Sequence, residues 1–113
     1  MLKKRIYVRG RGEGKSQWLA EQIHRVAATS PNTLLYYYGS PMDYQRTTLR
    51  YNMMFGTKCP LKLIDSSGNI YRSKVALFTD ELLKVGVWDV IPQLKTGLCD
   101  GDWYITMSAE DFI

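Results

Sequence analysis

Cysteine, histidine and long apolar segments are scarce in this sequence. Its 113 residues include two cysteines and one histidine. Cys59 and Cys99 lie far apart and form no Cys-x-x-Cys pair, so the sequence indicates neither a disulfide framework nor a zinc site. No apolar run is long enough for a signal peptide behind the basic residues 3–5, and none approaches the ~18 apolar residues of a membrane span. We therefore expect a cytoplasmic protein that has no membrane among its partners.

A strong excess of one charge is also absent. There are 15 basic and 11 acidic residues, which gives a net charge of +4 and a pI near 9.1. This balance permits contact with nucleic acid but does not require it. Hydrophobic residues make up 45% of the chain and charged residues 23%, as in ordinary globular proteins. The length, with no repeat or low-complexity segment, predicts a single domain over residues 1–113.

Glycine is concentrated in one stretch, Arg9-Gly-Arg-Gly-Glu-Gly-Lys-Ser16, between an apolar segment and a helical pattern. Strand, glycine-rich turn, Gly-Lys-Ser and helix together are typical of a phosphate-binding loop. Glycines allow successive backbone N–H groups to point into one concavity, and the helix adds its free N–H groups and the positive end of its dipole. The residues expected to bind ATP are Gly10, Gly12, Glu13, Gly14, Lys15, Ser16 and Gln17.

Two members of this loop have particular roles in the prediction. Lys15 would reach the β- and γ-phosphates, and Ser16 would offer a hydroxyl ligand to Mg²⁺. Arg9 departs from the full consensus, which has glycine at that position. The alternative is a glycine-rich hairpin turn beside a surface lysine, but the flanking strand and helix favour nucleotide binding.

An acidic pair follows a second apolar segment, at Asp80 and Glu81 after residues 75–78. A buried parallel strand would carry both carboxylates to the carboxyl edge of the sheet, where ligands bind in open α/β folds. There Asp80 would hold Mg²⁺ through water, and Glu81 would orient and deprotonate the attacking water. The alternative is a helix that begins after a strand.

The remaining patterns predict the other elements. Residues 17–29 read as a helix and residues 33–38 as a buried strand. Ser40 is a predicted N-cap of a helix that ends at Phe55, before Gly56. Further predicted elements are a hairpin over residues 61–73, a short helix within residues 87–95 and a last strand over residues 102–107.

Two arginines lie on one face of the predicted second helix. Arg46 and Arg50 are four residues apart and could contact phosphates. A solvated surface pair is the alternative. His24, in the first predicted helix, is expected to be structural or exposed and not a ligand.

With these motifs placed, the chain resembles a pared-down ATPase domain of the phage DNA-packaging motors, the large terminases and their relatives. The segment from Gly10 to Ser16 is similar to their variant phosphate loop, which carries an arginine four residues before the lysine. That residue is Arg11 here, and the resemblance implies that it acts on the γ-phosphate as a catalytic residue. In P-loop ATPases the end of the last strand lies beside the γ-phosphate, so Thr106 or Ser108 is a possible sensor. The alternative is that these polar residues simply end a strand.

The resemblance covers nearly the whole chain in order, with departures that begin with Arg9 in place of the first loop glycine. Residues 107–109 differ from the family's usual coupling motif, and we expect no counterpart of the family's N-terminal adenine-binding segment or C-terminal nuclease domain within these 113 residues. The predicted fold is an α/β three-layer sandwich with helices on both faces of a mostly parallel sheet and a hairpin insertion. The resemblance also implies that the last strand lies between the two motif strands, which gives the order 5–9, 102–107, 75–79, 33–38.

The leading functional prediction is Mg²⁺-dependent binding and hydrolysis of ATP, in DNA packaging or translocation. Expected partners are double-stranded DNA, further copies in a ring, or another motor or capsid component, in the host cytoplasm if a phage encodes the chain. One alternative is a non-catalytic nucleotide-binding or interaction module, which Arg9 and the short chain favour. Another is a small-molecule kinase, but residues 82–100 contain none of the arginines that its lid would need.

Overall fold

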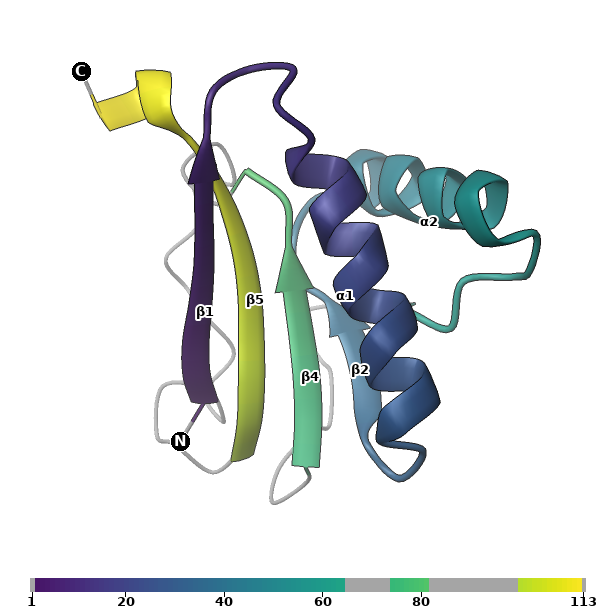
Figure 1. The fold of residues 1–113 in the computed structure, drawn as a ribbon. Helices are drawn as coiled ribbons and strands as arrows, with labels where there is room; N and C mark the ends of the chain where they lie inside the picture. The colour runs from purple at the N-terminus through teal and green to yellow at the C-terminus, as the bar shows by residue number, and fades with distance from the viewer. Residues whose placement is uncertain (1, 65–73, 82–99, 113) are drawn as a thin grey trace.

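The protein folds as a parallel sheet with two helices, in a computed structural model that describes residues 2–64, 74–81 and 100–112 (Figure 1). The α/β class is therefore as predicted. The elements in chain order are β1 (Leu2–Arg9), α1 (Lys15–Thr29), β2 (Leu34–Tyr37), α2 (Pro41–Phe55), β3 (Lys62–Leu63), β4 (Lys74–Thr79), β5 (Asp100–Ser108) and the 3₁₀ turn η1 (Ala109–Phe112).

The strand order is β1-β5-β4-β2-β3, and every pair is parallel. The last described strand, β5, lies between β1 and β4, with Arg9 opposite Ser108 and Thr79 opposite Ile105. The four predicted strands keep their predicted neighbours. The order differs from the prediction by a fifth strand, β3, at the edge beyond β2. Because all strands are parallel, the segments that follow β1, β4 and β5 emerge at one edge of the sheet.

The hairpin predicted for residues 61–73 needs a correction in its first arm. Lys62 and Leu63 pair in parallel with Tyr36 and Tyr37, and Ile64 N donates a hydrogen bond to Tyr37 O (2.9 Å). The chain returning from α2 thus extends the main sheet. A short apolar run predicts a strand but not which neighbour it pairs with. Residues 65–73, which include the second arm, lie outside the described part.

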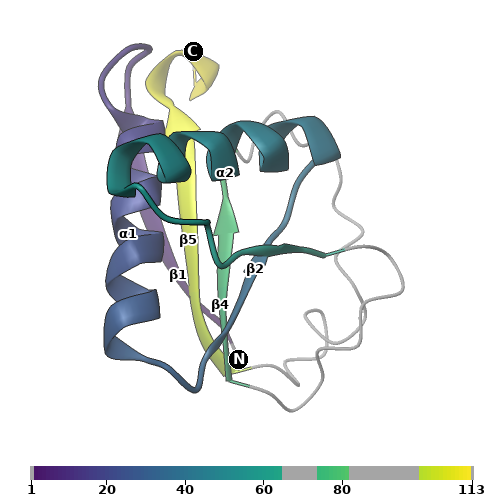
Figure 2. The same ribbon diagram turned by 90° about the vertical axis from the view of Figure 1, so that its right-hand side faces the viewer.

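Both helices cover the same face of the sheet (Figure 2). The core on this face joins Leu19 and Ile23 of α1 and Tyr51 of α2 to Phe78 and Tyr104 of the sheet. A second core cluster is formed around Val75, Leu77 and Ile105. The described helices thus form one layer on the sheet. The predicted third layer depends on the helix expected within residues 87–95, which is outside the described part.

Local signals in the sequence explain the bounds of the helices. Ser40 caps α2 by accepting a hydrogen bond from Asp43 N (3.1 Å), and Gly56 ends the helix with a φ of 68°. This start and this end were both predicted. Helix α1 begins at Lys15, earlier than predicted, directly after Gly14. Among the described residues, no helix has the length and apolar character needed to cross a membrane.

Candidate functional site

The phosphate-loop sequence forms a tight turn between β1 and α1. Gly12 and Gly14 have φ values of 72° and 81°, in the left-handed region that glycine adopts at little cost. Glu13 closes the turn, because its N donates to Gly10 O (3.3 Å) and its Oε1 accepts from Gly10 N (2.8 Å). The backbone is thus arranged as a compact loop at the N-terminus of a helix, where N–H groups and the helix dipole favour an anion.

Lys15 is buried inside this loop, with 7% of its surface exposed. Its Nζ donates a hydrogen bond to Gly10 O (2.8 Å) and lies 3.4 Å from Glu81 Oε1. A buried ammonium group needs such partners, because burial without them disfavours its charge. The lysine of the loop and the second acid of the predicted pair are therefore neighbours.

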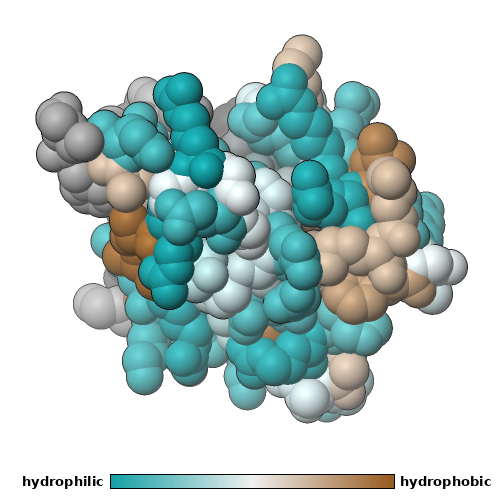
Figure 3. Space-filling view, turned by 45° about the horizontal axis from the view of Figure 1, so that its top comes forward, coloured by the Kyte–Doolittle hydropathy of each residue, from teal (hydrophilic) through white to brown (hydrophobic). Residues whose placement is uncertain are grey.

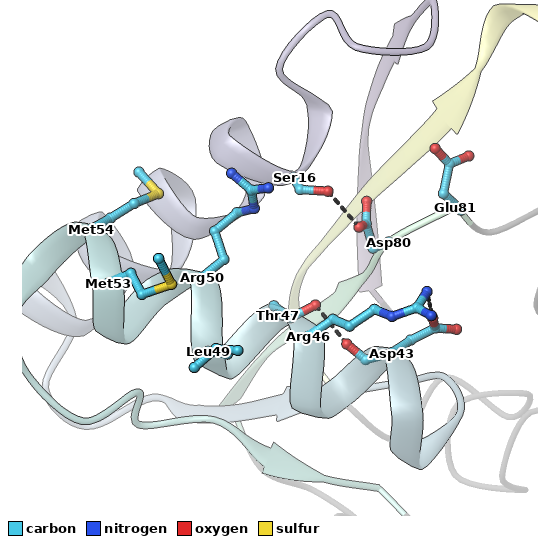
Figure 4. A pocket seen from close by; sticks show the side chains of 10 residues that line it. All are labelled: Ser16, Asp43, Arg46, Thr47, Leu49, Arg50, Met53, Met54, Asp80 and Glu81. Atoms are coloured by element: carbon cyan, nitrogen blue, oxygen red, sulfur yellow. Dashed lines mark hydrogen bonds and ion pairs between the residues drawn. The ribbon is translucent and has the colours of Figure 1, made fainter.

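Ser16 and Asp80 connect the two motifs directly. Ser16 Oγ donates to Asp80 Oδ2 at 2.8 Å, although the two residues are 64 positions apart (Figure 4). The buried hydroxyl of Thr106 lies behind them on β5. It donates to Asp80 Oδ1 and accepts from Glu81 N (2.8 Å). Thr106 thereby fixes both members of the acidic pair relative to the loop.

Glu81 is held in an uncommon backbone conformation. Its φ of 54° makes it the one non-glycine residue with positive φ among those described. Non-glycine residues in this region cluster at functional sites, where surrounding contacts stabilise them. The Glu81 carboxylate accepts hydrogen bonds from Ser108 Oγ at 2.8 Å to both oxygens, in addition to its pairing with Lys15. The two predicted sensors, Thr106 and Ser108, therefore both contact the acidic pair.

All of the predicted loop residues except Gly10 and Glu13 line one cavity. Arg11, Gly12, Gly14 and Gln17 border a cavity of about 420 Å³ together with Lys15 and Ser16. Arg11 N donates to Glu110 Oε1 of η1 (3.0 Å), and this hydrogen bond lowers the pKa of the Glu110 carboxyl group. The C-terminal turn thus contacts the loop, which the sequence did not predict. Arg9, which replaces the first loop glycine, lies with its guanidinium 4.4 Å from the centre of the Tyr7 ring.

Two further residues lie near the site: Tyr37, to which the sequence analysis gave no role there, and Arg50, which it named as a possible phosphate contact. Tyr37, at the end of β2, is fully buried, and its OH accepts a hydrogen bond from Asp80 N (3.3 Å). Burial raises the pKa of this phenol to about 12. Arg50 of α2 lines the loop cavity as well as a second cavity beside it. The position of Tyr37 at the end of a predicted buried strand could have indicated that it lies near the acidic pair. No pattern in the sequence predicts that α2 lies beside the loop.

The oxygen atoms of Ser16 and Asp80 suit Mg²⁺. This ion prefers oxygen ligands and usually takes only one or two from the protein, with waters and phosphate oxygens completing the octahedron. Among the described residues, no group of three or more histidine, cysteine, aspartate or glutamate side chains is placed to hold a metal. The donor set therefore fits a metal that arrives with a phosphate ligand. It does not form a closed structural metal site.

Comparison of the chain with protein-family models, with curated proteins and with solved structures finds no match.

Proposed function

We propose that the chain binds Mg²⁺·ATP at the loop formed by residues 10–17 and hydrolyses it to ADP and phosphate. The observation that supports this most directly is the Ser16–Asp80 hydrogen bond. It brings a loop hydroxyl and a strand-end carboxylate to one point, beside the buried ammonium group of Lys15. Two motifs that are each common alone occupy one site, as phosphoryl-transfer chemistry requires.

Each residue has a role in this proposal. Lys15 and the loop amides neutralise charge on the β- and γ-phosphates, and Ser16 with Asp80 would hold Mg²⁺, which supplies further positive charge. Glu81 orients a water molecule and accepts its proton as the water oxygen attacks the γ-phosphorus and the bond to the ADP oxygen breaks. Ser108 and Thr106 position the acidic pair. Arg11 meets charge that develops on the γ-phosphate in the transition state.

The resemblance to packaging ATPases extends this proposal to DNA translocation, with double-stranded DNA and further copies of the chain, or another motor component, as partners. A non-catalytic nucleotide-binding module is the second candidate. The observation in its favour is Arg9, which stands where the loop consensus has glycine. In that case ATP would bind at the same residues and the chain would act through a partner.

Glu81→Gln separates the two candidates. If Glu81 accepts the proton of the attacking water, this variant keeps its ATP affinity while turnover falls ~10²-fold or more. The measurements are calorimetry with ATP and Mg²⁺, and phosphate release with and without double-stranded DNA. Asp102→Asn is the control, because it changes one carboxylate to an amide at the opposite end of β5, where Asp102 pairs with Arg5.

Three more variants assign the remaining roles. Lys15→Ala should lose ~2–4 kcal/mol of ATP affinity, because it leaves phosphate charge without its cation. Asp80→Asn should weaken the Mg²⁺-dependent part of binding, and Arg11→Ala should lower turnover more than binding. Unchanged ATP binding in Lys15→Ala would refute the loop assignment. Wild-type turnover no greater than that of Glu81→Gln, with DNA present, would leave only the binding module.

A further inference from the structure

A cavity of about 640 Å³ lies between helix α2 and the phosphate loop (Figure 4). One wall is formed by α2, and Ser16, Asp80 and Glu81 form the side toward the loop. Ser16, Glu81 and Arg50 also line the smaller loop cavity, so the two spaces adjoin. The volume of the larger cavity is typical of pockets that bind small molecules. The proposed ATP would occupy the loop cavity, which leaves this second cavity beside the end where the γ-phosphate would lie.

Part of the wall that α2 contributes is apolar and open to solvent. Leu49, Met53 and Met54 line the cavity and keep 60%, 79% and 36% of their surface exposed. Figure 3 shows a brown and tan area on the side of the molecule where α2 lies. Exposed apolar patches beside polar groups often mark binding sites. Methionine side chains in particular make favourable contacts with aromatic rings.

The carboxylates of this cavity already have partners. Asp43 pairs with Arg46 (3.7 Å), Asp80 accepts from Ser16 and Thr106, and Glu81 is held by Lys15 and Ser108. In contrast, Arg50 has no hydrogen-bond or ion-pair partner in the described part of the chain. Its guanidinium group projects from α2 on the side of Ser16 and Asp80 (Figure 4). The charged group without a counter-charge at the junction of the two cavities is therefore the positive guanidinium of Arg50.

We propose that the larger cavity, between α2 and the phosphate loop, binds a nucleoside monophosphate as a second ligand. Its phosphate would pair with Arg50, which offers the forked donors that suit phosphate oxygens, and Arg46 lies one helical turn away to assist. Its base would lie on Leu49, Met53 and Met54. Inorganic phosphate would leave this apolar wall unused, and an apolar ligand would leave Arg50 without a partner. That the second ligand lies beside a γ-phosphate rests on the function proposed above.

The experiment titrates AMP into the protein by calorimetry, with the loop saturated by a non-hydrolysable ATP analogue and Mg²⁺. We expect AMP to bind, Arg50→Gln to weaken it about tenfold through the lost charged hydrogen bonds, and Met53→Ala to weaken it about threefold. Inorganic phosphate alone should bind at least tenfold more weakly than AMP. Lys3→Gln, which removes one positive charge from the opposite edge of the sheet, is the control and should have no effect.

Further measurements decide where AMP binds. In Lys15→Ala, AMP affinity measured without the analogue should persist, while affinity for the analogue should fall ~30-fold or more. Displacement of AMP by the analogue, or equal AMP binding by wild type and Arg50→Gln, would overturn the proposal. Binding of a 5′-phosphorylated oligonucleotide that depends on Arg50, in a protein that does not bind AMP, would also overturn the proposal. The ligand would then be the end of a nucleic-acid strand. If wild type binds AMP through Arg50 but never binds ATP, the second site stands and the proposed ATPase fails.

Discussion

A single threonine connects the parts of the candidate site. Thr106 is fully buried on β5, and its hydroxyl is a hydrogen-bond donor to Asp80 and an acceptor for Glu81 N. A hydroxyl group can both donate and accept a hydrogen bond. Tyr37 adds a second polar contact, to Asp80 N from β2. The acidic pair is therefore positioned by side chains from both neighbouring strands, so its geometry does not depend on the backbone of β4 alone.

Tyr37 should make stability depend on pH in the alkaline range. The pKa of its phenol is about 12 in the folded protein and near the ordinary 10.0 in the unfolded chain. Between these values the folded state binds more protons, so the free energy of unfolding should fall as the pH rises from 10 to 12. The loss should reach ~2–3 kcal/mol, at about 1.4 kcal/mol for each unit of pKa difference.

The measurement is urea unfolding of wild type and Tyr37→Phe at pH 9 and pH 11.5. The difference between the two proteins should shrink at the higher pH, because phenylalanine does not titrate. Tyr7→Phe, on the half-buried Tyr7 of β1, is the control for removing a phenol hydroxyl from another strand of the sheet. A constant difference between wild type and Tyr37→Phe would show that the burial of this phenol does not govern its titration.

At the scale of elements, α2 is capped at both ends and makes aromatic contacts with α1. Ser40 and Gly56 cap it, and His24 of α1 stacks on Phe55 with ring centres 4.0 Å apart. His24 Nδ1 also lies 3.2 Å from Tyr51 OH. The histidine is exposed and also joins the two helices, in line with the prediction that it is structural or exposed. These contacts fix where α2 lies and hence where Arg50 meets the loop.

Removal of the α2 cap should lower stability measurably. Ser40→Ala loses the acceptor for Asp43 N and should cost ~1 kcal/mol of unfolding free energy, measured by urea denaturation. Thr48→Ala is the matched control, because its hydroxyl lies within the helix and bonds only back to Gln45 O (3.0 Å). That change should stay within ~0.5 kcal/mol of wild type, since alanine is the better helix former. Equal losses in both variants would contradict the capping role.

The loop and the acidic pair could be predicted because each follows an apolar strand. Parallel strands bring their carboxyl ends to one edge, so the pairing of Ser16 with Asp80 follows from the fold class. The role of α2 could not be predicted in the same way. Its sequence shows that Arg46 and Arg50 share a face, but the direction of that face is set by tertiary contacts such as His24 with Phe55. Likewise, the apolar run at β3 did not reveal a parallel partner.

At the scale of the whole molecule, β1 is an edge strand of the sheet that the described residues form. Among the described strands, β1 pairs only with β5, and its exposed residues include Lys3, Lys4 and Arg5. An unpaired strand edge offers free N–H and C=O groups to another chain, and positive charges discourage such pairing. Association through this edge should therefore be limited mainly by charge repulsion.

We expect weak self-association that strengthens as salt screens these charges. Light scattering across protein concentration at low and high ionic strength would measure it, with ATP and DNA added in parallel samples. Ile6→Lys adds a positive charge to β1 at a side chain that is 52% exposed, and it should suppress association. Circular dichroism would check that this variant keeps its fold. A strict monomer in wild type under all these conditions would exclude the edge as a contact between copies.

The central position of β5 sets the time at which the site can assemble during synthesis. The ribosome makes the loop and β1 first and the acidic pair later, yet β1 and β4 each pair with β5. At about 5–20 residues per second, β5 is made on the order of seconds after Glu81. Until then Thr106 and Ser108 do not exist to position the two carboxylates. A nascent chain therefore carries both motifs before it carries β5, whose Thr106 and Ser108 hold the acidic pair in place.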